Sequence, residues 1–258
     1  MRKLLVLFGL IFSLLLFAAC SSGNQNGGIS WQKVKTGFYY SEFFKDQRDF
    51  ILVKMDPKYF HFSVYQNKNL EEAKTIKEIH QQEQALITFN GSFFGEDFKP
   101  VSFLKSDGKI FHKLSKANLV DGIFVFSKDD KPNLFSAESF KDSDDITFAM
   151  QNGPILLDEM GKAKIVSDTG KIGSRTALGI DKDQNVVLII IQQSLFNSGN
   201  GITLYQFADI LANDAQFKGM GLHSVLNLDG GASTGMMIGS QYYPEMDKVQ
   251  NMVIVKDK

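Results

Sequence analysis

Three apolar runs in the chain end in an asparagine with glycine close behind, and this repeated pattern constrains the fold most. The polar endings are Asn90-Gly91, Asn152-Gly153 and Asn227 with Asp229-Gly230-Gly231. Glycine after a polar residue lets the backbone turn tightly and lets a ligand approach closely. A side chain placed there is held by a rigid sheet and still faces the space beyond it. We therefore expect the strands to bring these residues to a shared cleft.

Each ending taken alone has a simpler interpretation, because Asn-Gly and Asp-Gly are also typical hairpin turns. The number of such sites favours the cleft. Arg175 adds to it, because it lies in the segment Gly173-Ser-Arg-Thr-Ala-Leu-Gly179, between two glycines. A structural ion pair remains the alternative for Arg175, and a turn-forming role remains the alternative for Asp229.

The rest of the pattern is rich in strands. Short runs of β-branched and aromatic residues predict strands at residues 50–55, 60–65, 85–89, 186–191, 225–229 and 236–243. Helices are predicted over residues 70–84 and from the capping box Thr203-x-x-Gln206 to the residues before Gly219. We expect an α+β fold, a single domain with a mixed, largely antiparallel sheet core and a few flanking helices.

The first 28 residues are expected to lie outside this fold. A cationic start, an apolar run at residues 4–17 and two alanines precede Cys20. The run is too short to span a bilayer, so residues 1–19 are predicted to be a signal peptide. Residues 20–28 are polar and glycine-rich, as in a flexible tether. The folded domain is then expected at residues 29–258.

Cys20 is the single cysteine of the chain, and its place after two alanines resembles the bacterial lipoprotein signal. In that signal the cysteine becomes the lipidated first residue, and two or three acyl chains hold a protein firmly on a membrane. We therefore expect secretion across the cytoplasmic membrane and a lipid anchor at Cys20 in the bacterial cell envelope. An ordinary cleaved signal with a chance cysteine is the alternative.

The charge composition argues against nucleic-acid binding. The 28 Lys and Arg residues nearly balance the 29 Asp and Glu residues, so no basic field favours nucleic acid. Metal signals are weak. The segment Asp181-Lys-Asp-Gln-Asn185 resembles the start of a calcium loop, but Val186 and Gln192 stand where that loop needs Gly and Glu. The segment is predicted to be a hairpin turn, and the acidic residues 142, 144 and 145 a solvated loop. We expect no obligatory metal and no cofactor.

Four blocks of the chain resemble, in order, the phosphodiester glycosidase domain family, which includes the mammalian enzyme that uncovers mannose 6-phosphate. The blocks are Asn90-Gly-Ser-Phe-Phe94, Gln151-Asn-Gly-Pro154, Ser174-Arg-Thr-Ala-Leu-Gly-Ile-Asp181, and Asn227-Leu-Asp-Gly-Gly231 with Ser233-Thr234. The resemblance covers roughly residues 86–253. It implies hydrolysis of a sugar linked through its anomeric carbon to a phosphate, in an envelope or extracellular glycan.

The residues suit that reaction. Arg175 offers a planar fork for phosphate oxygens, and Asp229 is expected to act as base or nucleophile at the anomeric carbon. Gly230 and Gly231 are expected to present backbone N–H groups to an anion. The full set of expected substrate-binding residues is Asn90, Asn152, Asn227, Gly91, Gly153, Gly230, Gly231, Ser233, Thr234 and Thr176. Phe93 and Phe94 are expected to wall the cleft.

Two other functions remain open. Gly231-Ala-Ser233-Thr-Gly235 fits the G-x-S-x-G pattern of a serine hydrolase. A strand rather than a helix is predicted after it, and no histidine follows Ser233. A surface lipoprotein that binds glycans without cleaving them would need nearly the same cleft.

Overall fold

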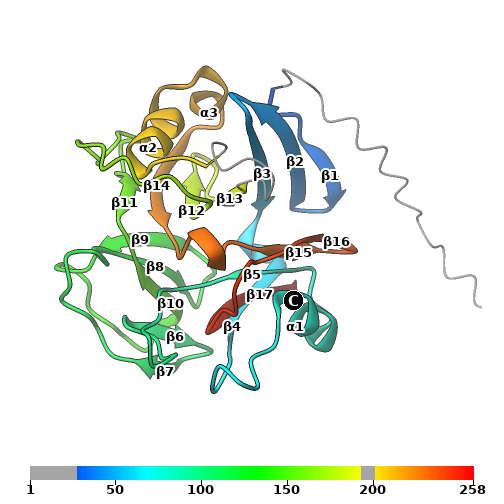
Figure 1. Ribbon diagram of the computed structural model, residues 1–258, viewed down its shortest axis with the longest axis vertical. Helices are drawn as coiled ribbons and strands as arrows, with labels where there is room; N and C mark the ends of the chain where they lie inside the picture. Colours follow the sequence, from blue (N-terminus) through cyan, green and yellow to red (C-terminus); the bar gives the residue numbers. More distant parts are fainter. Residues whose placement is uncertain (1–27, 193–200) are drawn as a thin grey trace, which may run out of the picture.

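The computed structural model describes residues 28–192 and 201–258, and antiparallel sheets dominate it (Figure 1). Sheets of seven, five and five strands contribute to one apolar core. Every strand ladder in the described residues is antiparallel. The largely antiparallel core is therefore confirmed. The mixed pairing is wrong for these residues, because many neighbouring strands follow each other as hairpins, which pair antiparallel by geometry.

The seven-stranded sheet fills the upper half of Figure 1. Its strands are, in spatial order, β1 (Gln32–Lys35), β2 (Phe38–Lys45), β3 (Arg48–Met55), β13 (Val186–Gln192), β12 (Arg175–Asp181), β14 (Leu222–Asn227) and β11 (Ile155–Leu157). The central strand β13 is buried on both faces. Ile189 and Ile191 belong to the cluster beneath the helices, whereas Leu188 and Ile190 face the core between the sheets. This two-sided burial explains its unbroken β-branched sequence.

Helices α2 (Leu204–Asn213) and α3 (Ala215–Gly219) cover the outer face of this sheet (Figure 1). The predicted capping box at Thr203 and Gln206 is present and starts α2. The sequence predicted one helix up to Gly219, but the chain breaks at Asp214. Its side chain accepts a hydrogen bond from the Gln216 N–H (3.0 Å) and so begins a separate helix.

The two five-stranded sheets occupy the lower half of Figure 1. One consists of β7 (Lys109–His112), β6 (Leu104–Ser106), β10 (Ile146–Asn152), β8 (Gly122–Ser127) and β9 (Pro132–Ser136). The other consists of β16 (Gln241–Tyr243), β15 (Met236–Ile238), β5 (Ile87–Asn90), β17 (Asn251–Asp257) and β4 (Phe60–Gln66). Short 3-10 turns lie at η1 (Pro57–Tyr59) and η3 (Gly231–Ser233).

Several predicted elements have different bounds in the structure. Helix α1 (Ile76–Glu83) is shorter than the predicted 70–84, because Thr75 and Glu78 form a capping box that starts it later. Residues 236–243 form the hairpin of β15 and β16 rather than one strand. The strand predicted at 225–229 is β14, which begins at Leu222 and ends at Asn227.

The three asparagines of the sequence pattern end strands in three different sheets. Asn90 ends β5, Asn152 ends β10 and Asn227 ends β14. Arg175 begins β12, the neighbour of β14. The pattern therefore marks the place where the three sheets meet.

Candidate active site

Asp229 lies in the turn after β14, and its backbone is held by the end of β5. Its N–H donates to the Gly91 carbonyl (3.2 Å), and its own carbonyl accepts from the Asn90 side-chain amide (2.7 Å). Both contacts cross from one sheet to another. The junction of the sheets therefore fixes the position of the Asp229 carboxyl group.

Burial raises the pKa of the Asp229 carboxyl to about 6. Two hydrogen bonds oppose this shift, one from the Ser233 hydroxyl and one from the Gly230 N–H, which lies 2.9 Å from Oδ1. A carboxyl group with such a pKa is mainly ionised at neutral pH, yet it accepts a proton within the physiological range. These properties suit a base or a nucleophile.

The Arg175 guanidinium is held by backbone carbonyls rather than by a carboxylate. Its Nε donates to the Ile202 carbonyl (3.1 Å) and one terminal nitrogen donates to the Lys171 carbonyl (2.7 Å). No ion pair involves Arg175 among residues 28–192 and 201–258. Burial lowers its pKa, although an arginine stays charged under ordinary conditions. This partly buried cation therefore has no anionic partner among the described residues.

Arg175 and Asp229 line one cleft of about 600 Å³. Gly230 lies between them. A Cβ atom on Gly230 would lie 3.6 Å from Arg175 Nη1 and 2.9 Å from the Ser174 carbonyl. Glycine is therefore required for this close approach. Asn227 and Gly153 line the same cleft.

Asn90 and Thr176 lie behind the cleft rather than in it. Both are fully buried. Asn90 Oδ1 accepts from the Thr176 hydroxyl (2.8 Å) and from the Gly235 N–H (3.3 Å), and its amide donates to Asp229. Neither side chain is among the residues that line the cleft. The structure gives them the task of holding the Asp229 turn.

Asn251 is a positioning residue that the sequence analysis missed. Its Oδ1 accepts from the Ser92 N–H (2.7 Å) and the Ser92 hydroxyl (3.2 Å), and its amide donates to the Ser92 carbonyl (3.1 Å). A Cβ on Gly91 would lie 2.1 Å from Asn251 Oδ1, so Gly91 has a packing role. Only strand pairing between β5 and β17 reveals this contact, and no local pattern signals it.

We expect Asn251→Ala to lower the free energy of unfolding by about 1–3 kcal/mol, because it leaves the buried Ser92 N–H without an acceptor. Urea unfolding of the variant and the parent chain measures this. Asn213→Ala is the matched control, since the Asn213 side chain is exposed and its one hydrogen bond among the described residues is to the exposed Asp209 side chain. Equal midpoints for Asn251→Ala and the parent would show that the contact adds no stability.

Three buried polar atoms have no partner in the described residues. They are Asn152 Nδ2, Asn227 Oδ1 and Thr234 Oγ1. Asn152 uses only its oxygen, which accepts from the Phe93 N–H (3.3 Å), and Asn227 uses only its amide, which donates to the Gly153 and Leu228 carbonyls. Buried polar atoms normally have partners. These atoms are thus the ones left for a bound molecule or water.

The backbone donors expected at Gly230 and Gly231 are not free. The Gly230 N–H donates to Asp229 Oδ1, and the Gly231 N–H donates to the Ser174 carbonyl (2.9 Å). Turn formation therefore already uses the two N–H groups that the sequence analysis expected to face an anion. Gly231 instead supplies the positive φ of +61° that starts η3.

The two phenylalanines of the first block have different surroundings. Phe93 lines the cleft, as expected from the sequence. Phe94 packs edge-on against Phe98 with ring centroids 5.3 Å apart, and it is not among the cleft residues. The two rings diverge because successive residues of an extended chain point to opposite sides.

The surroundings of Ser233 differ from those of a serine hydrolase nucleophile. Its hydroxyl bonds to Asp229. Ser233 is the last residue of η3, and strand β15 follows where a helix is required. His223 contacts the Ser224 hydroxyl (3.0 Å). The other three histidines are paired with residues remote from Ser233: His61 with Asp107, His80 with Thr88 and His112 with the Lys113 carbonyl.

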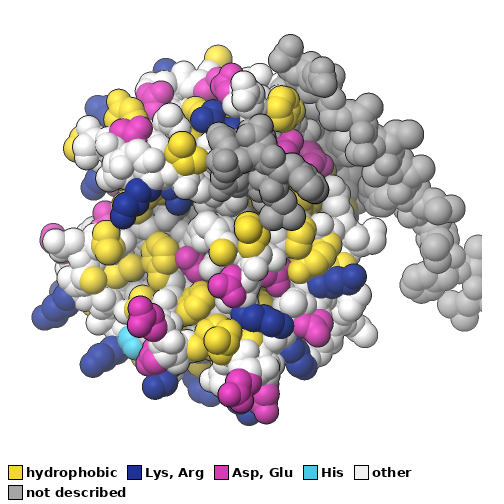
Figure 2. All heavy atoms as spheres, in the orientation of Figure 1, with side chains coloured by type: hydrophobic (Ala, Val, Ile, Leu, Met, Phe, Trp, Pro, Cys, Tyr) yellow, Lys and Arg dark blue, Asp and Glu magenta, His cyan; other side chains and the backbone are white. Residues whose placement is uncertain are grey.

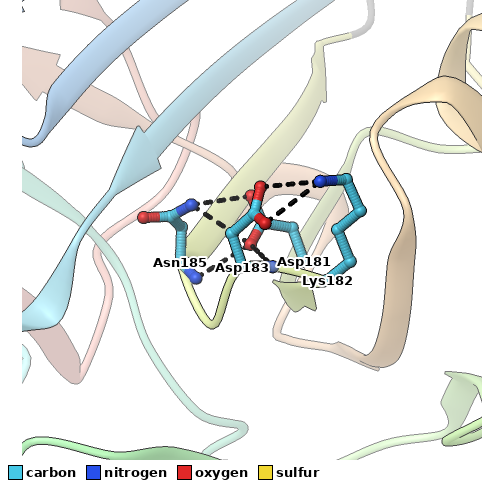
Figure 3. A network of polar contacts seen from close by, with 4 residues as sticks. All are labelled: Asp181, Lys182, Asp183 and Asn185. Atoms are coloured by element: carbon cyan, nitrogen blue, oxygen red, sulfur yellow. Dashed lines mark hydrogen bonds and ion pairs between the residues drawn. The ribbon is translucent and has the colours of Figure 1, made fainter.

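The segment that resembles a calcium loop forms the hairpin turn between β12 and β13, as predicted (Figure 3). Asp181 Oδ1 accepts from the Asp183 and Asn185 N–H groups (both 2.9 Å), and the Asn185 amide donates to both carboxylate oxygens. Asp142, Asp144 and Asp145 lie in an exposed loop, as predicted, and Asp142 also forms an ion pair with the buried Lys105 (2.7 Å). Within residues 28–192 and 201–258, no group of three metal-ligating side chains was found.

A family model for phosphodiester glycosidases matches residues 83–256, which is more than half of the chain. The chain belongs to this family. The match includes the blocks that carry Asn90, Asn152, Arg175 and Asp229. The resemblance seen in the sequence is thereby confirmed.

Three proteins similar to this phosphodiester glycosidase family member have low sequence identity to it. YigE of Escherichia coli K12 is 26% identical over an alignment of 180 residues, and the match covers 66% of each chain. The catalytic domain of zebrafish N-acetylglucosamine-1-phosphodiester α-N-acetylglucosaminidase, auto-inhibited by its pro-peptide, has a TM-score of 0.65 at 16% identity, and the match covers 90% of this chain and 87% of that one. A Synechocystis protein has a TM-score of 0.67 at 13% identity, with 90% and 64% covered. These structures share the fold.

Proposed function

We propose that the protein hydrolyses a sugar-1-phosphodiester at the bond between the anomeric carbon and the phosphate oxygen. The observation that carries this proposal is that Arg175 and Asp229 line the same cleft. Arg175 has no carboxylate partner in the described residues. A cation for phosphate beside a carboxylate for the sugar is what this reaction needs. Membership of the phosphodiester glycosidase family supports the same reaction.

Arg175 binds the phosphate in this proposal. Its Nε and one terminal nitrogen donate to backbone carbonyls, so the side chain is held rigidly while remaining N–H groups near Gly230 are left for phosphate oxygens. A fixed cation stabilises the charge that builds on the departing phosphate. Phosphate is itself a good leaving group, which lowers the need for a strong general acid.

Asp229 acts at the anomeric carbon, either by activating a water molecule or by direct attack. Its pKa of about 6 keeps it mainly ionised at neutral pH. The negative charge also stabilises an oxocarbenium-like centre. Asn227, whose Oδ1 is unpartnered, lies beside it in the cleft and is suited to accept a hydrogen bond from a sugar hydroxyl.

A panel of sugar-1-phosphodiesters tests the proposal, with released reducing sugar as the readout. N-acetylglucosamine esters belong in the panel because the zebrafish relative is named for that substrate. Release of sugar and of a phosphomonoester in equal amounts is expected. Binding of the esters without release would instead favour a glycan-binding lipoprotein.

We also propose that the protein is a lipid-anchored envelope protein, secreted through residues 1–19 and acylated at Cys20. These residues lie outside the described part of the chain, and the proposal rests on their sequence pattern. None of the helices in the described residues is long and apolar enough to cross a bilayer.

We expect Cys20→Ala to abolish lipidation and to move the protein from the membrane to the soluble fraction, because the acyl chains would be its anchor. Mass spectrometry and membrane fractionation of an expressing bacterial cell measure both effects. Ser21→Ala is a suitable control. An unchanged mass and an unchanged membrane fraction for Cys20→Ala would contradict the lipoprotein assignment.

A further inference from the structure

The cleft that holds Arg175 and Asp229 is polar at those residues and apolar over most of its remaining lining. The apolar part includes Phe93, Val101 and Leu119. Leu119 is 80% exposed and Val101 is 41% exposed, although both line a cleft. Figure 2 shows hydrophobic side chains gathered across the middle of one face, between the upper and lower sheets of Figure 1.

The loop that carries Leu119 is held by one buried side chain. Gln151 donates to the carbonyls of Ser115 and Val120 (both 2.8 Å), and its Oε1 accepts from the Ser115 N–H (2.9 Å). Gln151 is fully buried and directly precedes Asn152 and Gly153 at the end of β10. Both ends of the loop are thus fixed to the strand that leads into the cleft.

This arrangement distinguishes Leu119 from an ordinary exposed leucine. Scattered apolar residues are common on protein surfaces and need no explanation. Here the loop presents Leu119 and Ala117 in a fixed position, next to other apolar residues and in the same cleft as an unpaired arginine. A preformed apolar wall beside a few placed polar groups is typical of a small-molecule site.

We infer that the alcohol on the far side of the phosphate is an aliphatic one, an alkyl or lipid alcohol, and that it lies against this wall. The inference rests on the proposed function and adds its substrate class. Sugar and phosphate need the hydrogen-bonding groups at Arg175, Asp229 and Asn227. Leu119 and Val101 offer none, so they suit the part of the substrate that carries no hydroxyl groups. Bond cleavage then releases the sugar and an alkyl phosphate, with water supplying the hydroxyl and the proton.

The test compares methyl and hexyl esters of the same sugar-1-phosphate on the full chain carrying Cys20→Ala. We expect kcat/KM at least ~10-fold higher for the hexyl ester, since burial of about two methylenes accounts for that factor. Leu119→Ser should remove most of this preference, because kcat/KM for the hexyl ester should fall more than kcat/KM for the methyl ester. Leu70→Ser, at an exposed leucine (55%) between β4 and α1, is the matched control and should keep the preference.

Calorimetric binding of hexyl phosphate and methyl phosphate separates the two proposals. Turnover of both esters at equal kcat/KM would overturn the inference of an aliphatic alcohol and leave the proposed reaction standing. Turnover of neither ester would overturn the proposed reaction. In that case hexyl phosphate binding at least ~10-fold more tightly than methyl phosphate, with the difference lost in Leu119→Ser, would still support an aliphatic ligand. Equal binding of the two phosphates would overturn the aliphatic ligand as well.

Discussion

Asp229→Asn is expected to lower kcat on a sugar-1-phosphodiester by at least ~10²-fold, as for the loss of a general base or a nucleophile. The amide has the same shape, and its oxygen still accepts from the Gly230 N–H. The backbone contacts with Gly91 and Asn90 do not involve the substituted atoms. The loss of activity should therefore occur without loss of the fold. Steady-state kinetics beside circular dichroism measures both.

The same substitution should raise stability at neutral pH. The pKa of Asp229 is about 6 in the folded chain against an ordinary 3.8, so folding favours the protonated carboxyl. This contribution to stability is fully present below about pH 4 and is lost as the pH rises through 6. The amide of Asp229→Asn stays neutral, so the variant does not lose this stability as the pH rises. We expect its free energy of unfolding at pH 7–8 to exceed that of the parent by on the order of 1–3 kcal/mol.

The pH dependence of activity provides a second test of Asp229. If its ionised form reacts, activity should fall as the pH drops below about 6. Ser233→Ala removes a hydrogen bond that lowers the pKa of Asp229, so the acidic limb should move to higher pH while turnover persists. Loss of activity in Ser233→Ala, together with fluorophosphonate labelling of Ser233 in the parent chain, would instead identify a serine hydrolase. Full activity in Asp229→Asn would also reject the assignment.

Local patterns in the sequence predicted much of the frame of the site. The apolar runs that end at Asn90, Asn152 and Asn227 are strands with those ends. The residues that define each apolar run lie only a few positions apart in the chain, so the position of the strand follows from the local sequence. The capping box at Thr203 was likewise predictable.

The roles of individual side chains were less predictable, because contacts across sheets decide them. Asn90 stands in a sequence pattern typical of ligand-binding residues, yet its side chain makes three hydrogen bonds to other segments of the chain. Asn251 and Gln151 act from strands whose pairing joins distant parts of the chain. A sequence pattern thus located the junction but did not show which groups face the cleft.

The same limitation applies to the backbone N–H groups of Gly230 and Gly231. A glycine pair after a strand is compatible with an anion site. In this chain the Asp229 carboxylate and the Ser174 carbonyl accept from those N–H groups. Among the cleft residues, the charge that remains for phosphate is therefore that of Arg175.

Arg175→Lys should accordingly lower kcat/KM for phosphodiesters by at least ~10²-fold, the effect of losing one fixed donor to a developing oxyanion. Lysine keeps the charge but has no planar fork. It cannot bond to the Ile202 and Lys171 carbonyls and reach a phosphate with further nitrogens, as the guanidinium does. Neutral aryl glycosides of the same sugar, which lack phosphate, should lose less than ~10-fold.

Arg48→Lys is the matched control for this prediction. Arg48 also donates from Nε to a backbone carbonyl, that of Gly201 (3.1 Å), but it does not line the cleft. Its substitution should therefore leave both substrate classes unaffected. The constant for inhibition by inorganic phosphate gives an independent readout, which should rise only in Arg175→Lys. Equal losses on phosphodiesters and neutral glycosides would mean that Arg175 supports the shape of the cleft rather than the phosphate.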